Sequence, residues 1–114
     1  MAAVYVSNLI INAGADFNET FTLESYESNS YLNLENYEVT SQMRKWYGSV
    51  NVIPFITRID FPPSSGRITI FLAAEDSQDL KPGRYVYDVL LTNDYGVKTR
   101  VVEGSILVRE GVTR

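Results

Sequence analysis

The chain has 114 residues, a formal net charge of −4, and neither cysteine nor histidine. A chain of this length is expected to form one domain over residues 1–114, and its 45% hydrophobic content excludes a disordered protein. The missing residue types remove thiolate chemistry, soft metal ligands and the commonest general base, and the acidic balance offers nothing to nucleic acid or an anionic membrane.

Alternation of apolar and polar side chains with a period of two predicts β-strands along most of the chain. The predicted strands cover residues 4–11, 17–23, 37–45, 50–61, 67–73, 84–92 and 97–109. Glu19 interrupts the apolar side of the second strand, which indicates a position near a sheet edge. The strand over 84–92 is the most apolar, which favours a central position.

Turn and breaker residues separate these strands. Residues 24–35 are polar and predict a long loop or an irregular hairpin, and Pro54 predicts an edge strand or a bulge. Residues 75–80 predict a single helical turn, and residues 93–96 predict a hairpin turn. Gly104 predicts a bulge in the last strand.

The run from Leu80 to Tyr87 has the form of a tyrosine corner, in which a Tyr near the start of a sandwich strand bonds back to the preceding loop. Leu80 is the apolar anchor, Gly83 precedes the bend, and Tyr85 is the corner residue. In antibody domains a cysteine stands two places after this Tyr, whereas Tyr87 stands there in this chain. The sequence therefore predicts an all-β, immunoglobulin-like sandwich of about seven antiparallel strands with no disulfide.

Charged side chains provide weak candidates for chemistry. Glu75, Asp76 and Asp79 could hold a hard cation, but no calcium-loop spacing accompanies them, and a solvated turn capped by Asp76 or Ser77 is favoured. Asp88 is expected to face outward and to pair with Arg100 on the neighbouring strand. With no nucleophile beside a base, we predict no catalytic, cofactor-binding or metal site, and no enzyme.

Aromatic residues provide the candidate interface. Five of them cannot all be buried if the alternation holds, namely Tyr26, Tyr31, Trp46, Tyr47 and Phe71, since Phe71 and Trp46 fall on the outward sides of their strands. Tyr26, Tyr31, Trp46 and Phe71 are the candidate interface. They could form a protein–protein contact or a platform on which a carbohydrate stacks. Alternatively, a bend near Gly48 turns Trp46 back into the core.

Several segments together resemble a family of small structural proteins of tailed bacteriophages. The resemblance covers almost the whole chain and is carried by residues 10–17, 20–23, 32–39, 42–45, 66–70, 80–88, 91–92, 100–104 and 112–114. The chain is similar to the N-terminal module of baseplate and tail-fibre attachment proteins. Residues 43–48 and 108–111 resemble versions from contractile-tailed phages of marine cyanobacteria.

This resemblance implies a non-enzymatic virion protein of the tail, baseplate, neck or fibre attachment, assembled in the host cytoplasm. Its partners would be other virion proteins and further copies of itself, with no nucleic acid and no membrane. The alternatives are a head decoration or cement protein, and a carbohydrate-binding module for host adsorption that uses Tyr26, Tyr31 and Trp46. The chain shows no signal-peptide pattern and no apolar run of spanning length, so we expect a soluble protein that works inside a cell or an assembly.

Overall fold

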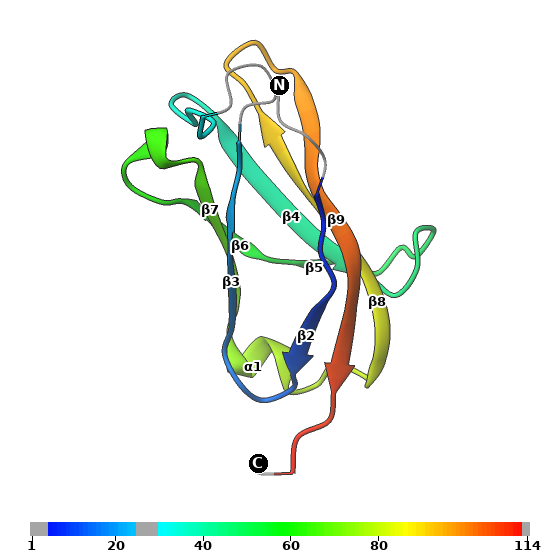
Figure 1. Ribbon diagram of the computed structural model, residues 1–114. Helices are drawn as coiled ribbons and strands as arrows, with labels where there is room; N and C mark the ends of the chain where they lie inside the picture. Colours follow the sequence, from blue (N-terminus) through cyan, green and yellow to red (C-terminus); the bar gives the residue numbers. More distant parts are fainter. Residues whose placement is uncertain (1–4, 25–29, 113–114) are drawn as a thin grey trace.

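The period-two pattern forms strands along most of the chain in the computed structural model, which describes residues 5–24 and 30–112 (Figure 1). In chain order the described residues form β1 (Tyr5–Val6), β2 (Leu9–Asn12), β3 (Phe17–Thr22), β4 (Glu38–Arg44), β5 (Ile53–Pro54), β6 (Ile56–Ile59), the 3₁₀ turn η1 (Pro63–Ser65), β7 (Arg67–Leu72), α1 (Ala74–Ser77), β8 (Gly83–Thr92) and β9 (Lys98–Arg109). The predicted helical turn is α1, which begins one residue earlier than expected.

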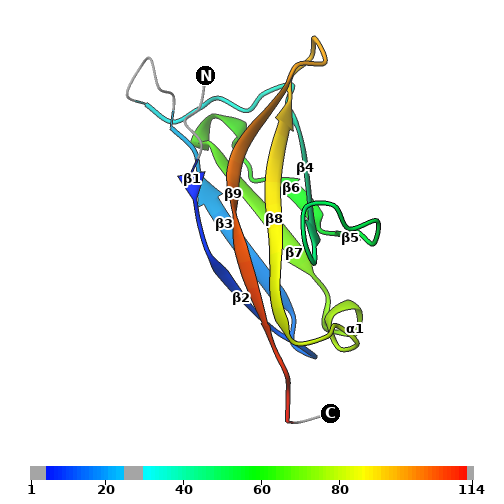
Figure 2. The ribbon, with the colours of Figure 1, turned by 90° about the vertical axis from the view of Figure 1, so that its right-hand side faces the viewer.

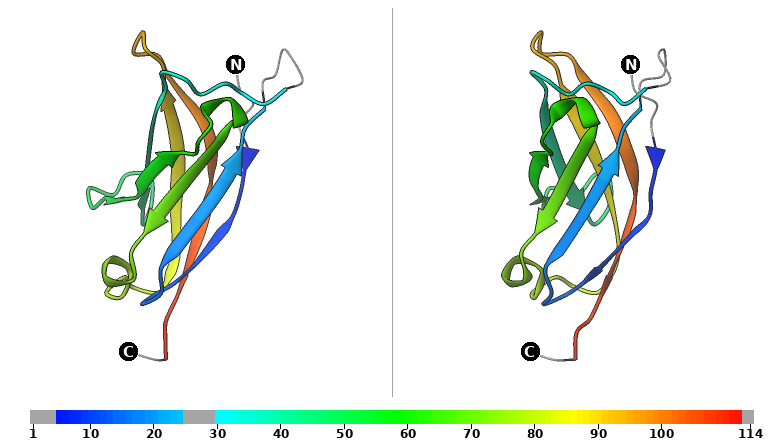
Figure 3. Two further views of the ribbon diagram at one scale, coloured as in Figure 1. Left: turned by 90° about the vertical axis from the view of Figure 1, so that its left-hand side faces the viewer. Right: turned by 60° about the vertical axis from the view of Figure 1, so that its left-hand side comes forward.

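The strands form two sheets that pack face to face (Figures 2 and 3). The larger sheet has the order β1-β9-β8-β4-β5, with β2 also paired to β9, and the smaller sheet has the order β3-β7-β6. The predicted immunoglobulin-like β-sandwich is confirmed. As predicted, β8 is central, Pro54 lies in an edge strand, and Glu19 lies in the edge strand β3.

The expectation that all strands are antiparallel is wrong at one edge. β1 and β2 pair with β9 in the parallel direction, with Tyr5 opposite Val102 and Leu9 opposite Ile106. Parallel neighbours need a long connection, and here most of the domain lies between the two segments along the chain. The described strands also outnumber the predicted seven, because the first segment divides at residues 7–8 and the fourth divides at Phe55.

The core lies between the inward faces of the two sheets. Its members are the alternating apolar residues that the pattern predicts, among them Ile11, Met43, Ile68, Ile70, Val89, Leu91 and Ile106, each at most 2% exposed. The rings of Phe17 and Phe55 meet with centroids 5.9 Å apart. Leu34, outside any strand, is 1% exposed and closes the core beneath the loop that leads into β4. Apolar burial therefore extends into the loops at that end.

The predicted bulge at Gly104 is wrong. The register between β8 and β9 shifts between Val89 and Leu90, which leaves Val101 as the extra residue. Val101 and its neighbour Val102 are both buried, which strict alternation would not allow. Gly104 remains in register opposite Tyr87.

Gly104 instead allows the edge strand to approach closely. A Cβ at Gly104 would collide with the backbone carbonyl of Ser7, at the break between β1 and β2. Ser7 keeps its own amide bonded to the Glu103 carbonyl at 2.9 Å. The side chain of Asn8 accepts hydrogen bonds from the amide and the hydroxyl of Ser105, each at 3.1 Å. Side chains thus satisfy β9 where the backbone pairing is interrupted.

Candidate interaction surface

The corner run is built into the fold. The Tyr85 hydroxyl donates a hydrogen bond of 2.8 Å to the Lys81 carbonyl, the contact that defines a tyrosine corner. Gly83 has φ +134°, and Leu80 packs against the core. The Lys45 ammonium lies 4.7 Å from the centroid of the Tyr85 ring, within the range of a cation–π contact. These side chains therefore hold the loop after α1 onto the sandwich.

Tyr87 occupies the position of the antibody cysteine and makes a different connection. Its hydroxyl donates a hydrogen bond of 2.7 Å to the Ser7 carbonyl, passing the space that Gly104 leaves open. Burial raises the pKa of Tyr87 to about 12, the Ser7 bond opposes this change, and the Glu19 carboxylate adds to it. An antibody disulfide joins the two sheets, whereas Tyr87 ties β8 to the edge strand within one sheet.

This raised pKa predicts a loss of stability in alkali. The folded protein holds the Tyr87 proton more tightly than the unfolded chain does, since the folded pKa is about 12 and the ordinary value is 10.0. The stabilisation is complete below pH 10 and is lost as the pH rises toward 12. Urea denaturation at a series of pH values should show the free energy of unfolding falling over this window. The free energy of unfolding of Tyr87→Phe should fall less steeply over the same pH range. Equal slopes for both proteins would contradict the assignment of this loss to Tyr87.

The acidic residues around α1 do not cap it, contrary to the prediction. Ala73 precedes the turn without a side-chain bond, and Asp16 accepts a hydrogen bond of 2.8 Å from the Ala74 amide. Ser77 is fully buried, and its hydroxyl accepts a hydrogen bond of 3.0 Å from the Gly14 amide. Within residues 5–24 and 30–112, no three His, Cys, Asp or Glu side chains gather in a way that could hold a metal ion.

The outer face of the larger sheet carries a groove of about 470 Å³. Outward-facing residues of β4, β8 and β9 line it, and Tyr47 from the loop after β4 lines it as well. Asp88 and Arg100 form the predicted ion pair there, 3.3 Å apart. Glu103 adds a second carboxylate and Arg44 a second guanidinium, so the groove contains both signs of charge. A partner could therefore find charged contacts of both signs in it.

A loop with exposed apolar side chains borders this groove. It covers residues 45–52 and is called the β4–β5 loop here. The exposed fractions are 63% for Trp46, 82% for Tyr47 and 90% for Val50. The alternative in which a bend turns Trp46 into the core is wrong. The Trp46 ring covers Gly48, where a Cβ would collide with it, and so the indole remains at the surface.

Hydrogen bonds hold the β4–β5 loop in place. The Arg44 guanidinium donates to the Ser49 carbonyl and, at 3.0 Å, to the Gln42 side chain. The Ser49 amide donates to the Trp46 carbonyl at 3.0 Å, and Ser49 is 9% exposed. The loop therefore presents its aromatic rings on a fixed backbone. A preorganised loop loses less conformational entropy on binding than a mobile loop does.

The structure separates the described members of the predicted interface. Tyr31 is 59% exposed and lies before β4, whereas Trp46 lies after it. A strand of seven residues spans about 20 Å, so these two rings cannot form one stacking platform. Phe71 is half-buried on the outer face of the smaller sheet, and Tyr26 lies outside the described residues.

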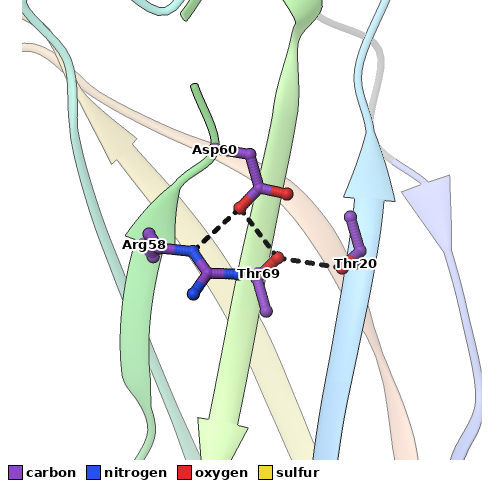
Figure 4. A network of polar contacts seen from close by, with 4 residues as sticks. All are labelled: Thr20, Arg58, Asp60 and Thr69. Carbon is purple, nitrogen blue, oxygen red and sulfur yellow. Dashed lines mark hydrogen bonds and ion pairs between the residues drawn. The ribbon is translucent and has the colours of Figure 1, made fainter. Parts of the chain in front are cut away.

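Polar contacts occupy the outer face of the smaller sheet, where Phe71 lies. Thr20, Thr69 and Asp60 form a chain of hydrogen bonds of 2.9 and 3.0 Å, and Arg58 completes it at 3.1 Å from Asp60 (Figure 4). Thr69 is 5% exposed although it points outward. These side chains satisfy one another across β3, β7 and β6, which makes this face a weaker candidate for binding.

Several exposed side chains were missing from the sequence-based interface. Among them are Tyr47, Val50, Phe61 at 89% and Tyr95 at 87%. Each lies in a loop, where period-two alternation does not apply. An aromatic residue beside turn-forming residues, such as Phe61 before Pro62 or Tyr95 before Gly96, is the signal that could have found two of them.

No helix among the described residues is long and apolar enough to cross a membrane. No protein-family model and no curated protein matches the chain. Among solved structures it is similar to part of an internalin-like protein of Listeria monocytogenes, with 16% identity, a TM-score of 0.44, and coverage of 95% of this chain and 28% of that one. It is also similar to part of a family 123 glycoside hydrolase from Clostridium perfringens, with 15% identity, a TM-score of 0.47, and coverage of 96% and 24%.

Proposed function

We propose that this protein is a non-enzymatic structural component of a tailed-bacteriophage virion, in the tail, baseplate, neck or fibre attachment. It acts by packing against other virion proteins or further copies of itself. The resemblance of its segments to phage structural modules motivates the proposal. The observation that carries it is the β4–β5 loop, which exposes Trp46, Tyr47 and Val50 on a hydrogen-bonded backbone beside the groove. Aromatic anchors of this kind dominate binding at protein interfaces.

The strand edges favour packing through this loop and groove over the addition of a strand from a partner. β5 contains Pro54, which has no amide hydrogen to donate, and β3 carries Glu19 on its inward side. A proline and an inward-pointing charge are both features by which proteins block edge-to-edge pairing. Two of the sheet edges are therefore poorly suited to receive another chain.

The first test is mass spectrometry of purified particles of the virus that encodes the chain. We expect the chain among the particle proteins, and its absence would overturn the proposal. Changing Trp46 and Tyr47 together to Ser should reduce the copies per particle on the order of tenfold or more, because hot-spot residues carry most of the binding energy.

Ile56→Ser provides the matched control. Ile56 is 64% exposed, on the outer face of the smaller sheet, so its loss should leave incorporation unchanged. Trp46 is the single tryptophan, and its emission should shift to shorter wavelength when assembly buries the ring. If the double variant and the control incorporate equally, the β4–β5 loop is not the contact.

A further inference from the structure

Three loops meet at the end of the sandwich opposite α1, called the loop end here. Its described residues are 23–24 and 30–37, 60–66 and 93–97. Leu34 donates its amide to the Pro63 carbonyl at 3.0 Å, and Leu23 donates to the Gly66 carbonyl at 2.8 Å. Glu38 pairs with Thr92, which places the start of β4 beside the β8–β9 hairpin (Figures 1 and 3). The described parts of the three loops therefore lie side by side.

Each loop contributes one exposed aromatic side chain among its described residues. Tyr31 is 59% exposed, Phe61 is 89% exposed and Tyr95 is 87% exposed. The Asn93 side chain accepts hydrogen bonds of 2.9 Å from the amides of Tyr95 and Val97, which fixes the tip of the hairpin. These large rings stand on hydrogen-bonded loops and have few rotatable bonds. Rigid aromatic residues beside Ser and Asn are typical of the binding loops of antibodies.

The charged side chains among the described loop residues have one sign. The described residues of the loop end include Glu24, Glu35, Asp60 and Asp94 and contain no Lys or Arg. Asp60 is paired with Arg58 of β6, whereas the other three acidic residues are exposed. The nearest basic residues in sequence, Arg67 and Lys98, begin the strands below the loops. The described residues of the three loops thus carry acidic side chains only, and the two basic residues lie at their border.

We propose that the loop end binds a basic protein surface of a virion partner, with Tyr31, Phe61 and Tyr95 as anchors and Glu24, Glu35 and Asp94 facing its lysine and arginine residues. The inference rests on the proposed function and adds a second contact, since the β4–β5 loop lies at the other end of β4. Complementary charge would select this partner and speed its docking, while the apolar rings would supply the affinity. With two separated contacts, the chain would connect neighbours in the particle.

The test uses carbodiimide cross-linking of purified particles, which joins carboxylates to the amines of lysines in direct contact. We expect cross-links from Glu24, Glu35 or Asp94 to another protein. Glu75, Asp76 and Asp79 around α1 serve as the internal control, because they carry similar charge at the opposite end of the sandwich. Equal cross-linking at both ends would overturn the proposal. So would an absence of cross-links at the loop end together with unaltered incorporation of the charge-reversal variant described next.

Charge reversal also tests for a partner that presents arginine but no lysine, to which the carbodiimide reaction cannot cross-link. Glu35→Lys with Asp94→Lys should reduce the copies per particle on the order of tenfold or more, whereas Glu75→Lys with Asp79→Lys should not. Thermal unfolding of the purified variants checks that both fold. Equal incorporation of the two variants overturns the inference and leaves the proposed function in place. Absence of the unaltered chain from particles would overturn both.

Discussion

Gly104→Val is expected to lower the free energy of unfolding by about 3 kcal/mol, because it adds a side chain where the edge strand touches β9. A Cβ at this position collides with the Ser7 carbonyl, which also accepts the hydrogen bond of Tyr87. The variant therefore combines overpacking with the loss of a hydrogen bond. Urea denaturation measures the loss, and hydrogen exchange should show β1 and β2 opening before the rest of the domain.

Thr99→Val is the control for this prediction. It places the same side chain elsewhere on β9, opposite Leu91, and keeps the shape of the threonine. Its effect should stay within about 0.5 kcal/mol, as for most substitutions that disturb no special contact. If Gly104→Val matched this control, the edge strand could move away from β9 without cost, and the role assigned to Gly104 would be wrong.

Gly83→Val is expected to lower the free energy of unfolding by about 2 kcal/mol. Its φ of +134° is rarely adopted by residues with a side chain, and holding one there costs about 1–3 kcal/mol. The added Cβ would also displace the Lys45 ammonium from the Tyr85 ring. For a domain of this size the melting temperature should fall by roughly 8 °C.

Two further variants separate the causes of this effect. Tyr85→Phe removes only the bond to Lys81 and should cost about 1 kcal/mol, because the carbonyl of an exposed residue can bind water instead. Lys45→Met removes the ammonium and keeps most of the side chain. In the Lys45→Met background, Gly83→Val should still lower the free energy of unfolding by the cost of the strained backbone. If the loss disappeared, the Lys45 contact would be the whole cause.

Features that depend on neighbouring residues were predictable from the sequence. The alternation over 67–73 placed Ile68, Ile70 and Leu72 in the core, where the structure has them. The pair of Asp88 and Arg100 also followed from alternation, since both residues face outward on adjoining strands of one hairpin. Period-two geometry and a short connection limit such pairs to a few registers.

Exposure in the loops could not be predicted in this way. Trp46 follows the last residue of β4, where a turn ends the alternation, and the sequence left both a buried and an exposed position open. The bond from Ser49 to the Trp46 carbonyl and the absence of a side chain at Gly48 decide the direction of the indole. The candidate interface was therefore right about the exposure of Trp46 and Tyr31 and omitted Tyr47, Phe61 and Tyr95.

By itself the sequence determined the β-sandwich, the order of its strands along the chain, and the loop that carries the corner. Only the tertiary structure decided which distant residues meet: Asp16 with Ala74, Ser7 with Tyr87, and the loop before β4 with the turn η1. It also decided that β1 and β2 pair with β9 in the parallel direction. The physical reason is that strand patterns and turns come from residues close in sequence, whereas these contacts depend on how the two sheets pack and on the register of β9.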